Sequence, residues 1–200
     1  MSLALVLAGG GARGAYEAGV MRYVMGTLPR VAGEAVIPRI ICGTSVGALN
    51  GTYLAGGLGD PGVALKLSAM WRNMTIGRIY RFVALDLLRS PLRLFGKKIS
   101  DSAALLDPEP LYDWVRSEFP WRGLRETVRR SDFGGLVLTA TDMTAGNPVN
   151  FIDAWQHQGP ATLGGLYRPD PSLRVIHTPL RVEHCLASCA IPFLFPPIPV

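Results

Sequence analysis

The pattern of apolar and polar positions along the first 60 residues predicts two strands, each followed by a helix. Residues 3–8 form a continuous apolar run that ends in glycines, which is typical of a strand buried on both faces in a parallel sheet. A helix ending near Pro29 should follow, with one amphipathic face made by Tyr16, Val20, Tyr23, Val24 and Thr27. A second strand over 37–42 and a second helix over 46–55 complete a βαβ unit, which indicates a parallel sheet.

The rest of the chain also alternates between predicted helices and predicted strands. Asp60-Pro61 and Asp107-Pro108 each predict an N-cap followed by proline at the first position of a helix. Residues 136–141 (LVLTAT) predict another buried strand, and the turn DMTAGNP leads into a strand over 149–152. A strand over 174–178 and a helix over 182–190, stopped by Pro192, come last. Because no repeat or linker interrupts the pattern, residues 1–200 are predicted to form a single domain.

Composition narrows the class of protein. A chain of 200 residues with 48% hydrophobic content can bury one core. The net charge of +5 permits attraction to anionic lipid, but no dense basic run with interleaved aromatics suggests a nucleic-acid partner. The three cysteines lack metal-ligand spacing, so we expect reduced, mostly buried thiols, no metal and a cytoplasmic chain. No run of about 20 apolar residues predicts a membrane span.

One basic amphipathic segment, residues 76–99, stands apart from the rest. It mixes arginines and lysines with large apolar residues. Such a segment could lie on an anionic membrane surface, with apolar side chains in the acyl boundary and cations near phosphates. It could equally pack its apolar face on the domain. The first alternative would make the protein peripheral to a membrane.

Two glycine motifs carry the candidate chemistry. Gly43-Thr44-Ser45-Val46-Gly47 is a G-x-S-x-G sequence between a predicted strand and a predicted helix, the context of a nucleophile elbow. In such an elbow the serine hydroxyl projects from a strained turn, and the flanking glycines avoid side-chain collisions. The positive end of the following helix would point at Ser45, where negative charge develops during attack on an ester.

The second motif, GGGARG over Gly9 to Gly14, has two interpretations. The N–H groups of Gly10 and Gly11 could bind an oxyanion beside Ser45, and Arg13 could either add positive charge there or pair with a helix end. The spacing also matches the G-x-G-x-x-G dinucleotide fingerprint. That fingerprint expects an acid at the end of the second strand, but Glu34 precedes the strand. A nucleotide-binding function is therefore disfavoured.

An ordinary α/β-hydrolase also fits poorly. Its serine normally follows several strands, whereas Ser45 follows the second, and its triad requires a histidine. His157, His177 and His184 lie in contexts without a turn signature after a late strand. We interpret all three as surface or core histidines.

Taken together, GGGARG, GTSVGALNG, LLDPEPL, LVLTATDMTAGNPVNF and ASCAIPFLFPP resemble a patatin-like phospholipase of the bacterial type, over nearly the whole chain. The resemblance implies a three-layer α/β/α fold with a mainly parallel sheet, and a Ser-Asp dyad that works without histidine. It implies Ser45 as nucleophile, an oxyanion hole made by Gly9, Gly10, Gly11, Arg13 and Gly14, and an elbow of Gly43, Thr44, Val46 and Gly47. The substrates would be phospholipids or other lipid esters, with no metal or cofactor.

The family carries its aspartate in an Asp-Gly-Gly or Asp-Gly-Ala motif shortly after a proline-rich stretch like PFLFPPIPV, in which this chain stops. No aspartate here is followed by glycine: Asp60 and Asp107 precede prolines, Asp101 lies in a polar turn, and Asp142 and Asp153 flank the NPVN hairpin. We therefore expect an N-terminal part of a longer chain, with the dyad aspartate beyond residue 200 and little activity in the fragment. The alternative is an inactive lipid- or membrane-binding module on the same scaffold, with 76–99 as its contact region.

Overall fold

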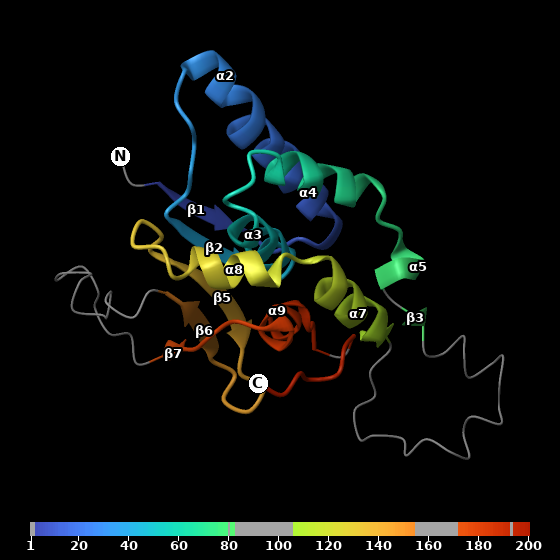
Figure 1. The fold of residues 1–200 in the computed structure, drawn as a ribbon. Helices are drawn as coiled ribbons and strands as arrows, with labels where there is room; N and C mark the ends of the chain where they lie inside the picture. Colours follow the sequence, from blue (N-terminus) through green and yellow to red (C-terminus); the bar gives the residue numbers. More distant parts are fainter. Residues whose placement is uncertain (1–2, 80, 83–105, 155–171, 193) are drawn as a thin grey trace.

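The computed structural model describes residues 3–79, 81–82, 106–154, 172–192 and 194–200. Its centre is a five-stranded sheet in the order β1-β2-β5-β6-β7 (Figure 1). The strands are β1 (Ala4–Leu7), β2 (Ile40–Thr44), β5 (Gly135–Thr141), β6 (Pro148–Asp153) and β7 (Arg174–His177). All neighbouring pairs are parallel except β5 and β6, which form an antiparallel hairpin. The predicted fold class is confirmed: a mostly parallel sheet with helices around it, consistent with a three-layer α/β/α fold.

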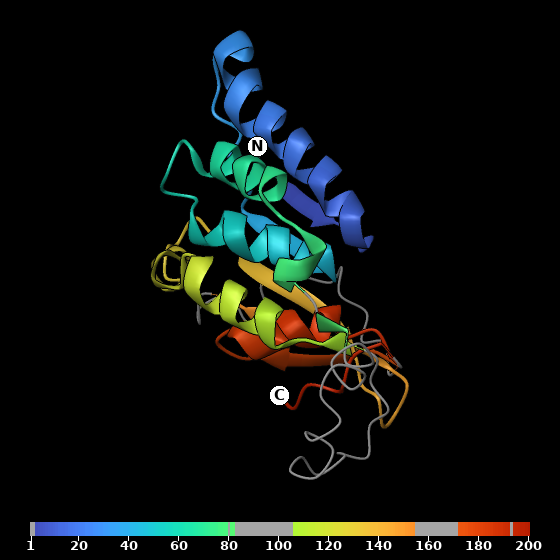
Figure 2. The ribbon, with the colours of Figure 1, turned by 90° about the vertical axis from the view of Figure 1, so that its right-hand side faces the viewer.

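The helices pack on one another and on the strands (Figure 2). They are η1 (Gly11–Arg13), α1 (Gly14–Met21), η2 (Arg22–Thr27), α2 (Leu28–Ala32), α3 (Val46–Gly56), α4 (Val63–Arg72), α5 (Ile76–Ile79), α7 (Glu109–Glu118), α8 (Trp121–Thr127) and α9 (Val182–Cys189). Helix α3 contacts β1, β2 and β5, and α9 contacts β5. A short antiparallel pair, β3 (Arg81–Phe82) and β4 (Leu106–Asp107), lies apart from the main sheet. Helix α8 was not predicted.

The core lies between the central strands and α3. Leu136 and Leu138 of β5, Ile41 of β2 and Leu54 of α3 are fully buried. Burial of each such side chain contributes about 1.5–3 kcal/mol relative to exposure. The small residues of VGALNGTYLAG let α3 approach the strands closely, and almost every residue of α3 is buried. This packing holds the beginning of α3 against the carboxyl ends of β1 and β2.

Strand β1 corrects the first prediction. It is not buried on both faces, because Ala4 is exposed and Val6 is 76% exposed, while Leu7 is buried. The strand lies at the edge of the sheet and pairs with β2 alone. A run of apolar residues therefore marks the strand correctly but does not reveal whether a second layer covers its outer side.

The first helix also differs from its prediction. Its buried face is formed by Gly14, Ala18 and Met21, whereas Tyr16 is exposed. Small residues bring α1 close to α3 and α4, and this contact sets which side faces inward. The helix does not end near Pro29, because the π-helical segment η2 leads into α2 with that proline in its first turn, where no intrahelical N–H is required.

The two Asp-Pro pairs precede helices, as expected, but neither aspartate is the N-cap. Asp60 Oδ1 accepts a hydrogen bond from Gly62 N (2.8 Å), and Gly62 is the N-cap of α4. Asp107 Oδ1 accepts one from Glu109 N (3.0 Å) ahead of α7. Each carboxylate therefore closes a turn just before its helix.

Some predictions concern residues outside the described ranges. Most of the 76–99 segment, with His157 and Asp101, lies there, and the structure describes only 76–79 and 81–82 of that segment. Among the described helices, none combines the length and apolar content needed to cross a membrane.

Candidate active site

Ser45 lies at the junction of β2 and α3 in a strained conformation. Its φ of 55° makes it the one non-glycine residue with positive φ in the described part of the chain. Holding a serine there costs about 1–3 kcal/mol and requires surrounding structure to maintain it. The Ser45 carbonyl accepts the N–H of Ala48 (2.8 Å), so the strained residue is also the start of the α3 hydrogen-bond ladder.

The glycines on either side of Ser45 allow backbones to touch. A Cβ added to Gly43 would lie 2.4 Å from Gly47 O, and one added to Gly47 would lie 2.3 Å from Leu7 O. Both distances are far below contact, so any side chain would force β1, β2 and α3 apart. Thr44 is exposed, whereas Val46 is buried in the packing at the start of α3.

The glycine loop between β1 and α1 lies beside Ser45. A Cβ added to Gly9 would be 3.3 Å from Ser45 Cβ, and Gly11 adopts a left-handed φ of 56°. The N–H groups of Gly10 and Gly11 have no acceptor among the described residues. Unpaired backbone donors of this kind are what an oxyanion requires.

Arg13 and Gly14 occupy different positions relative to this loop. The Arg13 side chain lies along Gly10, since a Cβ added to Gly10 would be 3.1 Å from Arg13 Nε. Arg13 is exposed and forms no ion pair with any described carboxylate, so its charge stays beside the loop. Gly14 is a packing position: an added Cβ would lie 2.3 Å from Val46 Cγ2 and 2.6 Å from Trp71 Cζ2.

Ser188 on α9 holds the strained serine from the opposite side. The Ser45 N–H donates to Ser188 Oγ (2.8 Å), and the Ser188 hydroxyl donates to the Thr139 carbonyl at the end of β5 (2.6 Å). One hydroxyl therefore links β2, β5 and α9. The sequence analysis assigned Ser188 no role, although a serine within the small-residue run ASCA, so close to a proline-rich stretch, was a usable signal.

Asn50 links the glycine loop to the elbow helix. Its Nδ2 donates to Gly14 O and to Glu17 Oε2 (3.0 Å each), and its Oδ1 accepts Trp71 Nε1–H (2.8 Å). The side chain is almost completely buried, with both amide atoms satisfied. The network ties α1 and α4 to α3, and the sequence did not predict it because its members come from three separate helices.

The groups that could accept a proton from Ser45 do not include a described histidine. His184 is buried, its Nδ1 accepts the N–H of Arg181 (3.0 Å), and its ring packs on Phe151. His177 is exposed at the end of β7. Cys189 contacts the Ser45 hydroxyl, but burial raises the pKa of this thiol, and the hydrogen bond from Ser45 opposes that rise only partly. Cys189 is therefore a neutral thiol.

The described aspartates are engaged elsewhere. Asp153 pairs with Arg125 (3.1 Å) and accepts Leu180 N–H (2.8 Å), which makes it a buried structural anion. Backbone N–H groups of Thr144 and Ala145 lower the pKa of Asp142 and hold it in its turn. Among the described residues, no aspartate is hydrogen-bonded to Ser45. Within the described ranges there is also no cluster of side chains that could hold a metal ion.

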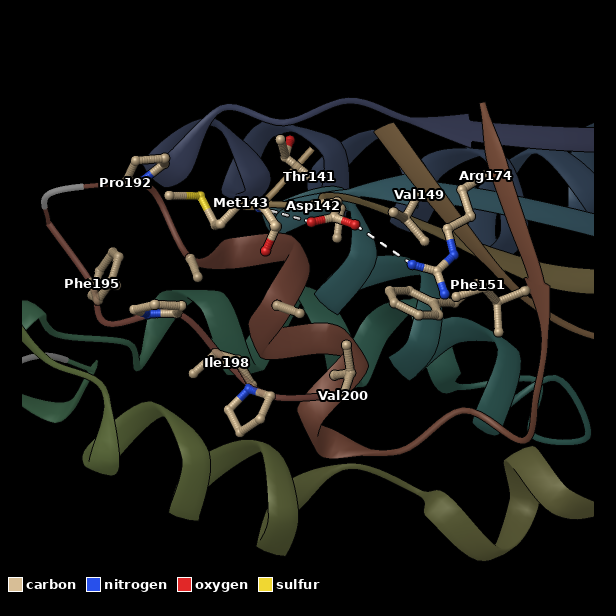
Figure 3. A pocket seen from close by; sticks show the side chains of 17 residues that line it. Thr141, Asp142, Met143, Val149, Phe151, Arg174, Pro192, Phe195, Ile198 and Val200 are labelled. Carbon is tan, nitrogen blue, oxygen red and sulfur yellow. Dashed lines mark hydrogen bonds and ion pairs between the residues drawn. The ribbon is translucent and has the colours of Figure 1, made fainter. Parts of the chain in front are cut away.

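A cavity of about 730 Å³ lies next to this region. Figure 3 shows its walls: the ends of β5, β6 and β7, helix α9, and the tail at Pro192 and over 195–200. The lining is mostly apolar and includes Val149, Phe151 and Ile198, with the Asp142–Arg174 ion pair (3.6 Å) at one side. Ser45 does not line the cavity. Helix α9 contacts both: Ala187 of α9 and Ala190 just after the helix line the cavity, and Ser188 of α9 bonds to the elbow.

Comparison with known proteins gives one family. The model of the patatin-like phospholipase family matches residues 5–200. No curated protein matches the chain.

Proposed function

The chain belongs to the patatin-like phospholipase family, a family of lipid acyl hydrolases, and from this premise we propose that Ser45 is the nucleophile of an ester hydrolysis. The observation that carries the proposal is the strained φ of Ser45 beside a loop with unpaired N–H groups. A strained backbone of this kind persists only where the surrounding structure holds it in place, and such residues are concentrated at active sites. The lipid substrate class comes from the family.

In the proposed first step, Ser45 Oγ attacks the ester carbonyl carbon. The new C–O bond places negative charge on the former carbonyl oxygen, which the N–H groups of Gly10 and Gly11 would bind. Arg13 lies along Gly10 and contributes positive charge at the same place. The N-terminal end of α3 adds a partial positive charge of about half an elementary unit.

The base that receives the Ser45 proton is proposed to be an aspartate outside residues 1–200. Two observations support this position: no aspartate of the chain is followed by glycine, and no described aspartate bonds to Ser45. The proton then passes to the leaving alcohol as the ester C–O bond breaks. Water attacks the resulting acyl-enzyme with the same base, which releases the fatty acid and restores Ser45.

The apolar cavity beside α9 is proposed to receive the acyl chain. Its volume lies within the range of about 300–1,000 Å³ that ligand pockets occupy. Apolar walls at Val149, Phe151 and Ile198 suit a hydrocarbon chain, and α9 contributes Ala187 to the cavity and Ser188 to the elbow.

The test uses protein expressed from its complete reading frame. Ser45→Ala should lower the rate of hydrolysis of a short-chain p-nitrophenyl ester by at least about a thousandfold, because the covalent step is lost. A fluorophosphonate should label wild-type protein on the peptide that contains Ser45, and the variant should stay unlabelled. Ser117→Ala is the matched control, since Ser117 is an exposed serine whose hydroxyl bonds to its own helix.

Two comparisons separate this proposal from an inactive lipid-binding scaffold. The 200-residue chain alone should be nearly inert beside the complete protein, because an unassisted serine is a poor nucleophile at neutral pH. Full activity of Ser45→Ala would refute Ser45 as the nucleophile, whereas absence of ester hydrolysis and labelling in the complete protein would favour the scaffold function.

A further inference from the structure

Residues 11–32 form a continuous helical rod that turns an apolar stripe outward. The stripe consists of Tyr16, Tyr23 and Val31, which are 76%, 55% and 77% exposed. The opposite side of the rod packs on α3 and α4 through small and apolar residues. Figures 1 and 2 show that the α2 end of the rod projects past the other elements. Scattered exposed apolar residues are ordinary, but three along one face form a surface.

The π-helical segment over Arg22–Thr27 keeps this face aligned. Arg22 and Arg30 are eight residues apart, as are Tyr23 and Val31. An uninterrupted α-helix of about 3.6 residues per turn would rotate the second member of each pair past the first. The i→i+5 bonding of a π turn takes more residues per turn and offsets this rotation. Arg22 and Arg30 accordingly line the same groove.

The exposed charged side chains of the rod itself are all arginines. Arg13, Arg22 and Arg30 are exposed, and no ion pair joins them to a described carboxylate. Glu17 is the one acidic residue in the sequence of the rod, and its carboxylate turns inward to accept a hydrogen bond from Asn50. Three arginines beside two exposed tyrosines therefore share the surface without a compensating anion on the rod.

A groove of about 900 Å³ adjoins the arginines. Its walls include Met25, Ile37 and Leu65, of which Ile37 and Leu65 are large apolar residues exposed by about half. Apolar area thus extends from the stripe across the flank that carries Arg22 and Arg30.

We propose that this outer face of the rod docks on an anionic lipid surface. Tyrosine rings suit the interface because their apolar body and polar tip match its two sides, and arginines beside them meet lipid phosphates. A second copy of the chain is a poorer occupant, because a two-fold interface would bring the same unpaired arginines together. The surface differs from the 76–99 segment, which the sequence offered as one candidate for membrane contact.

The position of the rod links this docking to the proposed chemistry. The glycine loop beside Ser45 runs directly into α1, and Tyr16 follows Gly14 by two residues. Docking along the rod would hold the loop end of the molecule near lipid. The inference rests on the proposed function only in assigning the docked lipid as a source of substrate.

The experiment measures flotation of the protein from its complete reading frame with vesicles of phosphatidylglycerol and of phosphatidylcholine. Wild type should prefer phosphatidylglycerol. Arg22→Gln/Arg30→Gln should weaken that binding about thirtyfold at low salt, and the difference should shrink in about 1 M NaCl, where the Debye length is about 3 Å. Tyr23→Ser/Val31→Ser should also weaken binding, with little dependence on salt. The control Arg116→Gln/Arg129→Gln removes the same charge from α7 and the segment after α8 and should change binding less than about threefold.

Three results would overturn the inference: no preference for phosphatidylglycerol, equal losses in the two arginine pairs, or a dimer in sedimentation that Tyr23→Ser/Val31→Ser dissociates. Hydrolysis of a soluble short-chain ester is measured on the same samples. Retained hydrolysis without vesicle binding refutes the docking alone, whereas vesicle binding without hydrolysis refutes the proposed enzyme.

Discussion

Replacing Ser188 by alanine tests how the strained elbow is held. The Ser188 hydroxyl accepts Ser45 N–H at 2.8 Å and donates to Thr139 O at 2.6 Å. Alanine removes both bonds and leaves a donor and an acceptor in a half-buried position. A buried group left without its partner costs about 1–3 kcal/mol, so we expect the free energy of unfolding to fall by that amount.

The second expectation concerns the chemical step. Without the bond from Ser188, the unfavourable φ of Ser45 can relax, which displaces its hydroxyl from the glycine loop. A displacement of about 1 Å is worth about a hundredfold in rate, so kcat should fall by about 10- to 100-fold while KM changes little. Ser188→Thr keeps the hydroxyl and should recover most of kcat, which identifies Ser188 as a positioning residue.

The assays are urea unfolding and hydrolysis of a soluble ester at a temperature where every variant is folded. Ser117→Ala serves as the matched control and should change stability by less than about 0.5 kcal/mol, as surface substitutions usually do. If Ser188→Ala is folded and keeps kcat within twofold of wild type, the argument that this hydroxyl positions Ser45 is refuted. Equal loss in Ser188→Thr would refute it as well.

Two further predictions follow from the cavity and from His184. Ala190→Leu should narrow the cavity. The ratio of dodecanoyl to butanoyl ester turnover should then fall at least about tenfold, which is the scale of discrimination by a few methylenes. An unchanged ratio would exclude this cavity as the acyl site. Desolvation lowers the pKa of His184 in the folded protein below its value of about 6.5 in the unfolded chain. As the pH falls below about 6.5, the unfolded chain therefore binds a proton before the folded protein does, and the free energy of unfolding should decrease. Urea midpoints at pH 7.5 and 5.5 should therefore differ more for wild type than for His184→Gln, and parallel shifts would contradict the assignment.

Much of the fold was accessible from local patterns. The run LVLTAT became the central strand β5, and VEHCLASCA became α9, because burial and helix-stopping prolines act over a few residues. The elbow at Ser45 was accessible for the same reason. The pattern G-x-S-x-G marks the turn locally, and the structure has close backbone contacts at both glycines: Gly43 lies against Gly47 within the turn, and Gly47 lies against Leu7 of β1.

Other features depended on packing between distant elements. The periodicity of the first helix selected a face with Tyr16, Val20, Tyr23 and Val24, yet the contact with α3 and α4 divided that face: Val20 and Val24 pack against the core, whereas Tyr16 and Tyr23 are exposed. The apolar run of β1 gave no sign that it would become an edge strand. Aromatic and apolar residues occur on both faces of this helix and this strand, so only the elements that pack against them decide which face is buried.

The sequence by itself determined most strands and helices in their order along the chain, the place of the turn at Ser45 and the glycine loop, because each is marked by residues close together in the chain. Tertiary structure alone decided what surrounds Ser45. Its N–H bonds to a hydroxyl 143 positions away, and the loop beside it is tied down through Asn50. Such contacts depend on the packing of β5, α1 and α9 around the elbow, and no local pattern encodes that packing.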